Sequence, residues 1–323
     1  MVLTIELDVA ELAATRVAIS PLSETVACLR QLGGRERQAS ALPWLRWAAD
    51  ELARVPLDLP WTWPLIVSDR PSWPEFLVPA PRGSGPSIED DLAALRRTTA
   101  RQVRRSLGRV FGAELRGTTA ELAERPAAGL KAIAGELREA HDRLIAPHWP
   151  RIRAVLDADV AHRARALATG GAAQLFDGLH PELEWRGGRL LLTGDRGPVH
   201  LGPGGLVLIP VVLGCPHVLV KRSTSTQTTV RYPARGRGAL WTAGTHPLPS
   251  GTVRLLGRAR AGLLEALRSP ATTTELARAL GVTPSAVSQH LTVLRENGLV
   301  DRQRSGRQVL YLSTALGTSL LGG

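Results

Sequence analysis

The chain has 323 residues, of which 44% are hydrophobic, and this length accommodates two domains that each bury a core. A formal net charge of +11 and a mean hydropathy of −0.02 predict a soluble globular protein that favours anionic partners, nucleic acid first and an anionic membrane second. Two cysteines that lie far apart, Cys28 and Cys215, exclude a disulfide framework.

The first dozen residues carry Glu6, Asp8 and Glu11, which argues against a secretory signal. The longest apolar run, residues 205–215, is interrupted by Pro210 and is too short for a bilayer, which needs about 20 residues. We therefore expect a cytoplasmic protein without a membrane partner.

The first 87 residues combine short strands, helices and a proline-rich stretch. Ser20 and Pro21 give a helix start, and Gly33-Gly34 a helix end. The patterns predict strands at 3–8 and 16–19, helices from Pro21 to Leu32 and over 36–54, and an extended or loop segment at 56–87.

Residues 88–168 read as helices interrupted at Gly129 and Pro147. After Gly170-Gly171 the pattern changes to strands, with a hairpin at 183–194 that turns at Gly187-Gly188. We predict a β-rich segment over 183–232 and a linker over 233–253.

The last segment, 254–323, predicts three helices, a hairpin and a final short helix that holds Leu316, Leu320 and Leu321. The helices are expected at 255–267, from Thr272-Thr273 to Leu280, and at 284–296, and the hairpin has its tip at 305–307. In the third helix Val287, Leu291 and Leu294 form an apolar stripe, Thr283 gives an N-cap and Gly298 a stop. This order of elements is typical of a winged helix-turn-helix.

The other face of the third helix is small and polar. In a helix-turn-helix the second helix of the pair enters the major groove, where Gln bonds adenine and hydroxyls bond bases or phosphates. Arginines near the wing tip suit contact with the DNA backbone or with the minor groove. The DNA-binding candidates are Thr283, Ser285, Ser288, Gln289, His290, Thr292, Arg295, Arg302, Arg304 and Arg307. The alternatives are a solvated face of a structural helix, a His290 that packs at its edge, and wing arginines that serve only solubility.

The run TTTELARALGVTPSAVSQHLTVLRENGLVDRQRSGRQVLYLST resembles the ArsR family of bacterial repressors. The resemblance covers roughly the last 65 residues and implies a homodimeric DNA-binding repressor released by an effector, often a metal. The segment ELARALGV, however, lacks the paired cysteines of the family's arsenic and cadmium sensors, so no metal is expected there. The preceding region, ending in YPARGRGALW, resembles an uncharacterised region attached to ArsR-like winged helices and implies no activity.

Two other groups of residues have competing interpretations. A metal site at His141, His148, Asp157, Asp159 and His162 is less economical than caps, core contacts and ion pairs with Arg151, Arg153 and Arg163. The arginine-rich run 96–109 fits nucleic acid or a partner subunit, although a solvated or internally paired face is favoured. No nucleophile motif is present in the sequence.

Five tryptophans lie within thirty residues: Trp44, Trp47, Trp61, Trp63 and Trp73. Such a cluster suits a small buried core and the wall of an apolar ligand site equally well. These residues are the candidates for a site that binds a small organic effector.

Together these patterns predict a mainly α, α+β protein in two parts, an N-terminal regulatory or dimerisation region (1–253) and a winged helix-turn-helix (254–323). We expect a non-enzymatic transcriptional regulator, without cofactor or metal, that binds an inverted repeat of double-stranded DNA as a homodimer. One alternative is an enzyme or small-molecule-binding protein whose winged helix only tethers it to DNA or a partner. Another is a winged helix that contacts protein.

Overall fold

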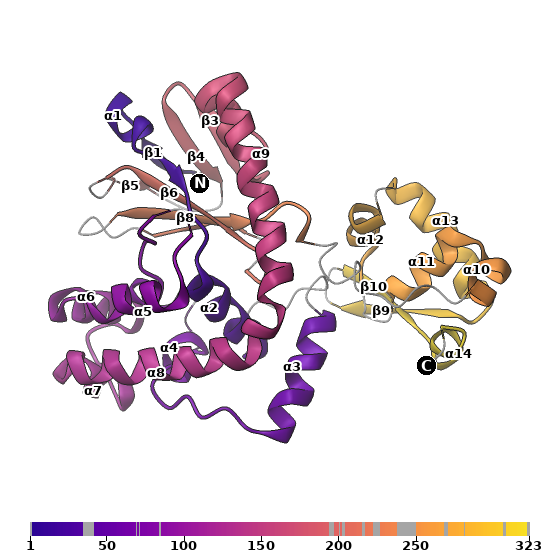
Figure 1. Ribbon diagram of the computed structural model, residues 1–323, viewed down its shortest axis with the longest axis horizontal. Helices are drawn as coiled ribbons and strands as arrows, with labels where there is room; N and C mark the ends of the chain where they lie inside the picture. The colour runs from indigo at the N-terminus through magenta and orange to yellow at the C-terminus, as the bar shows by residue number, and fades with distance from the viewer. Residues whose placement is uncertain are drawn as a thin grey trace. The chain divides into compact units, whose positions relative to one another are not determined.

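The computed structural model describes residues 2–34, 42–68, 70, 72–83, 85–193, 197–199, 201, 204–214, 217–221, 227–237, 250–267, 271–280, 282–305 and 308–321. The chain forms two compact units, of which unit 1 comprises residues 1–36 and 55–235 and unit 2 comprises residues 37–54 and 236–323. This division differs from the single boundary at residue 253 that the sequence suggests. The fold is mainly helical with small sheets, which confirms the predicted class (Figure 1).

The first sheet of unit 1 places the N-terminal strand between strands from much later in the chain. Its order is β3-β4-β1-β5, with β1 (Val2–Glu6), β3 (Leu183–Arg186), β4 (Arg189–Thr193) and β5 (Gly197–Val199). Leu3 and Ile5 of β1 are buried and lie opposite Leu192 and Leu190 of β4. The hairpin predicted at 183–194 is present, and Gly187 and Gly188 have φ of +58° and +79°, which a tight two-residue turn requires.

The second sheet has the order β2-β6-β8-β7. Its strands are β2 (Arg16–Val17), β6 (Leu206–Val211), β7 (Leu219–Val220) and β8 (Thr228–Pro233), and β6 is buried along its whole length. Leu208 and Val230 share one apolar core with Leu3, Ile5 and Phe176. Both sheets and the end of α9 therefore enclose the same core.

Most helices of unit 1 form a layer beside these sheets, whereas the short α1 (Val9–Ala13) lies apart from them, next to β1 (Figure 1). The other helices are α2 (Pro21–Leu32), α4 (Trp63–Ile66), α5 (Ile88–Arg96), α6 (Ala100–Phe111), α7 (Thr118–Glu124), α8 (Pro126–Leu144) and α9 (Trp149–Phe176), with 3-10 turns at Glu75–Leu77 and Ala146–His148. Helix α2 begins at the predicted cap, because the Ser20 side chain accepts from Ser23 N. Glu24 of α2 accepts from Val212 N and Leu213 N at 2.6 and 2.9 Å, which ties this helix to the chain just after β6.

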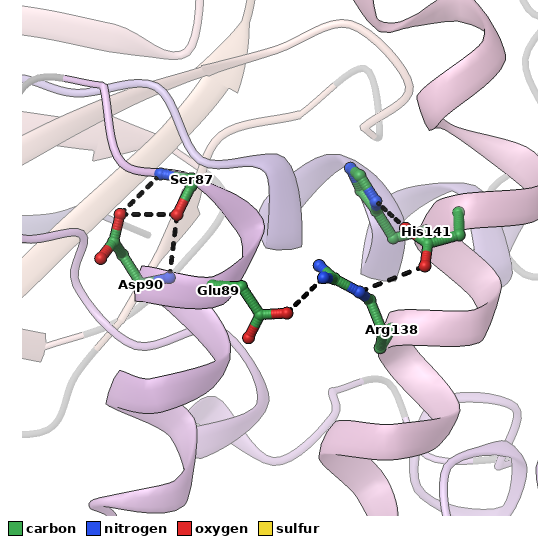
Figure 2. A network of polar contacts seen from close by, with 6 residues as sticks. Ser87, Glu89, Asp90, Arg138 and His141 are labelled. Atoms are coloured by element: carbon green, nitrogen blue, oxygen red, sulfur yellow. Dashed lines mark hydrogen bonds and ion pairs between the residues drawn. The ribbon is translucent and has the colours of Figure 1, made fainter.

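Polar contacts join α5 to α8 (Figure 2). Ser87 and Asp90 form a capping box at the start of α5. In the same turn Glu89 pairs with Arg138 of α8, whose Nε lies 3.1 Å from Asp142 Oδ2. His141 Nδ1 is 3.2 Å from the other oxygen of the same carboxylate. One acidic residue on each helix thus neutralises Arg138.

Three local predictions in unit 1 need correction. Helix α8 runs through Gly129 without interruption. The glycine allows Leu122 to approach closely, since an added Cβ would overlap that side chain. Segment 56–87 contains α4 and the turn at 75–77 as well as loop. The helical pattern continues past 168 to Phe176 and bends at Gly171, where φ is +65°.

Unit 2 contains α3 (Leu42–Arg54), α10 (Ser250–Leu256), α11 (Arg258–Ala266), α12 (Thr273–Leu280), α13 (Pro284–Glu296), β9 (Val300–Ser305), β10 (Gln308–Ser313) and α14 (Ala315–Ser319). The helix predicted over 255–267 is split at Gly257, whose φ of +78° ends α10. Leu316 of α14 is exposed, whereas Leu321 just after this helix is buried. In the described part of the chain, no helix is long and apolar enough to cross a membrane.

Candidate nucleic-acid interface

Helix α13 is fixed to unit 2 by its apolar face. Val287, Leu291 and Leu294 are fully buried and share a core with Leu264 of α11 and Leu276 of α12. Burying three such side chains contributes roughly 1.5–3 kcal/mol each. The predicted stripe is confirmed, and it determines which side of α13 faces away from the core.

Both ends of α13 are capped as the sequence predicts. The Thr283 hydroxyl accepts from Ala286 N at 3.3 Å and lies 3.0 Å from the hydroxyl of Ser285. At the other end Leu299 N donates to Leu294 O at 2.9 Å, and Gly298 has a φ of +68°. The helix therefore has a defined start and a defined end.

The polar face of α13 is open to solvent. Thr283, Ser285, Ser288, Gln289 and Thr292 are all exposed. The Thr292 hydroxyl donates to Ser288 O at 3.0 Å, so its oxygen is left to accept. Among the described residues, the Ser288 hydroxyl and the Gln289 side-chain amide make no hydrogen bond, so both side chains are available to an external partner.

His290 and Arg295 are half-buried and lie between the apolar and polar faces. This position agrees with the alternative in which His290 packs at the edge of the helix. Each side chain still reaches solvent on one side.

A two-stranded wing follows α13. Strands β9 and β10 pair antiparallel from Val300↔Ser313 to Ser305↔Gln308. Tyr311 of β10 also exchanges two 2.9 Å backbone hydrogen bonds with Ala271, which anchors the wing beside α12. Arg302 is exposed on β9. The side chain of Arg304, and Arg307 altogether, lie outside the described residues.

The histidines and aspartates considered as metal ligands take part in contacts within unit 1. Arg153 pairs with Asp157 at 2.9 Å, as predicted. Asp159 accepts from the Tyr232 hydroxyl at 2.6 Å and from Arg235 N at 3.0 Å. Within the described ranges, no group of three or more His, Cys, Asp or Glu residues is arranged to hold a metal ion.

The five candidate tryptophans are divided between the two units. Trp44 and Trp47 lie on α3 in unit 2, whereas Trp61, Trp63 and Trp73 belong to unit 1. Trp44 is buried, and Trp73 is buried against Arg231, whose guanidinium lies 4.3 Å from the ring centroid. The structure does not gather the five side chains in one unit.

Comparison with known proteins bears on both parts of the chain. Residues 255–303 match the family model described as a helix-turn-helix domain. The C-terminal part of this chain is a helix-turn-helix domain. Residues 84–238 match a model described as a family of unknown function (DUF5937).

One curated relative resembles the same C-terminal part. It is the HTH-type transcriptional regulator YgaV of Escherichia coli (strain K12), 48% identical over 44 residues. The match covers 13% of this chain and 44% of that protein, so this chain spans less than half the length of its relative. No solved structure matches the chain. The helix-turn-helix domain and this likeness support a DNA-binding regulator.

Two features that bear on function are not predicted from the sequence. One is the grouping of residues 37–54 with unit 2. The other is a cationic cavity in unit 1, to which Arg16, Arg105 and Lys221 all contribute. The arginine-rich run 96–109 is the only signal for that cavity in the sequence, because its other members are scattered along the chain.

Proposed function

We propose that this protein is a transcriptional repressor of the ArsR type that binds an inverted-repeat operator as a homodimer. The observation that carries the proposal is the two-sided character of α13. One side is buried at Val287, Leu291 and Leu294, and the other exposes Ser288 and Gln289. A rigidly anchored helix with exposed amide and hydroxyl groups is suited to read base edges in the major groove.

In this proposal the wing supplies affinity and α13 supplies sequence preference. Arg302 on β9 contacts a phosphate, and phosphate contacts add affinity for any sequence. Gln289 bonds a base, for which adenine offers the matching donor and acceptor pair. The exposed hydroxyls of Ser285 and Ser288 bond neighbouring bases or phosphates.

We expect a homodimer because the part of the chain that the structure describes contains one such helix. Two-fold pairing places two recognition helices about 34–36 Å apart, one turn of the duplex, and multiplies both affinity and specificity. Sedimentation of the purified protein, with and without an operator duplex about three helical turns long, measures this stoichiometry.

We further propose that unit 1 responds to a small organic effector and is not an enzyme. A ligand changes DNA affinity only if it binds the free and the DNA-bound states differently. Release from DNA in the presence of the effector is the repressor behaviour expected from the ArsR resemblance.

Selection of genomic fragments by the full-length protein tests the DNA-binding proposal. Wild-type protein should enrich fragments that share an inverted repeat at moderate salt, and a Ser288→Ala, Gln289→Ala double variant should lose this enrichment. Neither substitution removes a side-chain hydrogen bond within the described structure, and Ala is a better helix former than Ser or Gln. An unchanged melting temperature confirms that the variant folds. Wild-type protein that binds all fragments equally contradicts the proposal.

A further inference from the structure

A cavity of about 410 Å³ lies within unit 1. Its walls come from β2, the turn at 75–77 and the loop that follows it, the end of α5, one side of α6, and residues at the facing ends of β7 and β8. This volume falls in the range of sites that bind small molecules, which is about 300–1,000 Å³. Every lining residue belongs to unit 1.

The charge of the cavity wall is strongly positive. Glu75 is the one carboxylate among the lining residues that the structure describes. The lining cations are Arg16, Arg82, Arg97, Arg105, Arg109 and Lys221. So many like charges around one cavity repel each other, and an anion inside it relieves that repulsion.

Two of these cations hold the wall together. The Arg16 guanidinium donates to Gly83 O at 2.8 Å and also to Pro81 O, which ties the loop after the turn to β2. Arg109 pairs with Glu75 at 3.0 Å, which joins α6 to that turn. These contacts hold the turn at 75–77 and the loop that follows it in place against α6 and β2.

The other lining cations have charges that a ligand can neutralise. Arg82, Arg97 and Arg105 are exposed, and none of the three has an ion-pair partner in the described part of the chain. Lys221 is different, because only 4% of the residue is exposed. Burial lowers its pKa to about 8, although the nearby Glu75 carboxylate opposes the shift. A buried ammonium is costly unless an anion reaches it, and among the described residues no ion pair engages this one.

The lining also offers apolar surface. Phe76, Pro79 and Ala80 contribute carbon to the same walls. A ligand that fits this combination carries a compact, multiply charged group toward the cations and a carbon skeleton toward these residues. A planar guanidinium donates two parallel hydrogen bonds to a pair of phosphate oxygens. A carboxylate also offers a pair of oxygens, but it carries only about half the charge of a phosphate group.

We infer that this cavity binds a small phosphorylated molecule. This molecule would be the effector of the proposed function, and only its effect on DNA affinity rests on that proposal. Binding itself is a property of unit 1 and is measured without DNA, so it succeeds or fails independently of the regulator proposal.

Calorimetric titration of the full-length protein with pyrophosphate tests this inference, with citrate as a carboxylate probe at the same ionic strength. The matched variants are Arg105→Gln, which removes a lining cation, and Arg101→Gln, an exposed arginine of the same helix outside the cavity. We expect one pyrophosphate per chain, with binding at least about tenfold weaker in Arg105→Gln and unchanged in Arg101→Gln. Arg97→Gln, just after α5, should weaken binding in the same way.

Several results would overturn the inference. One is the absence of saturable pyrophosphate binding to wild-type protein at millimolar concentration, and another is binding of citrate alone. Equal weakening by Arg105→Gln and Arg101→Gln would mean that only the general charge of α6 matters. If Arg105→Gln weakens binding of bulk double-stranded DNA and leaves pyrophosphate unaffected, the surface belongs to the DNA interface.

Discussion

The hydroxyl of Tyr232 on β8 donates a 2.6 Å hydrogen bond to Oδ2 of Asp159 on α9, and both residues are 1% exposed. Oδ1 of the same carboxylate accepts from Arg235 N at 3.0 Å. The guanidinium of Arg163 lies 5.6 Å from the Tyr232 ring centroid and donates to two carbonyl oxygens beyond α9. One buried aspartate thus holds the last strand of unit 1, and the chain just after it, against the longest helix.

Replacing this tyrosine should destabilise unit 1. Tyr232→Phe removes a donor to a buried carboxylate, and hydrogen bonds to charged groups contribute about 1.5–3 kcal/mol. Urea unfolding followed by tryptophan fluorescence should show a loss of that size. The chain's other tyrosine gives the control, because Tyr311 is half-buried in unit 2 and Tyr311→Phe should cost much less. Equal losses would contradict a special role for the Tyr232–Asp159 bond.

Two glycines of unit 2 should respond in opposite ways to a methyl group. Gly317 of α14 is buried, and a Cβ there would overlap the carbonyl oxygen of Leu299. Gly262 of α11 has no atom within 4 Å of an added Cβ. Gly317→Ala should therefore destabilise unit 2 by about 1–3 kcal/mol, since backbone cannot move aside cheaply. Gly262→Ala should stabilise it by about 0.5–1 kcal/mol. Thermal unfolding of both variants checks the difference, and stabilisation by both would contradict this packing.

The free energy of unfolding should depend on pH through the buried Asp91. Burial raises its pKa to about 6, although hydrogen bonds from the Ser20 hydroxyl at 2.7 Å and from Leu22 N at 3.2 Å oppose the shift. The unfolded chain has the ordinary value near about 3.9, so the folded state binds this proton more tightly. The contribution of Asp91 to stability is therefore fully present below about pH 4 and is lost as the pH rises through about 6, a change on the order of 3 kcal/mol.

The substitution Asp91→Asn isolates this contribution. The difference in unfolding free energy between wild type and variant should change between about pH 4 and 6 and stay constant above about pH 7. Urea unfolding at several pH values gives the difference, and Asp58→Asn, at an exposed position of unit 1, serves as the control. If wild type and the Asp91→Asn variant differ by the same free energy at every pH, then Asp91 titrates normally and the prediction is wrong.

Local signals in the sequence are sufficient to predict the ends and the buried side of α13. Thr283, Pro284 and Gly298 define its ends within a few residues, and the stripe from Val287 to Leu294 defines its buried side. Each of these features depends on neighbours within one or two helical turns. Such signals do not depend on the rest of the fold, and for this reason the polar face could be predicted residue by residue.

Other features depend on contacts between distant segments, which no local pattern encodes. Strand β1 pairs with β4, which lies far later in the chain, although the alternation in β1 says only that one face is buried. The amphipathic pattern of α3 predicts a helix but not the unit to which it belongs. The cationic cavity joins Arg16, Arg97 and Lys221, and only the folded chain brings these positions together.

The proposed contacts of α13 and the wing should separate in a salt titration. Gln289→Ala should reduce affinity for the selected operator about 5- to 150-fold, the roughly 1–3 kcal/mol of a bidentate base contact, and leave bulk DNA affinity unchanged. Arg302→Gln should weaken both DNAs by the same factor. It should also reduce the slope of log K against log salt by about 0.9 for a lost phosphate contact.

The two substitutions should differ because Gln289 and Arg302 are proposed to contact chemically different parts of the DNA. Phosphates are present in every sequence and bind counterions, which Arg302 releases, whereas the edge of a base is uncharged and differs from pair to pair. Anisotropy titrations from about 50 to 200 mM salt, on operator and on scrambled duplex, give both quantities. Arg186→Gln, an exposed charge of unit 1 paired with Glu184, controls for loss of net charge and should leave the slope unchanged. If Gln289→Ala lowers the slope, or Arg302→Gln affects the operator alone, the assignment of base and phosphate contacts to these two residues is wrong.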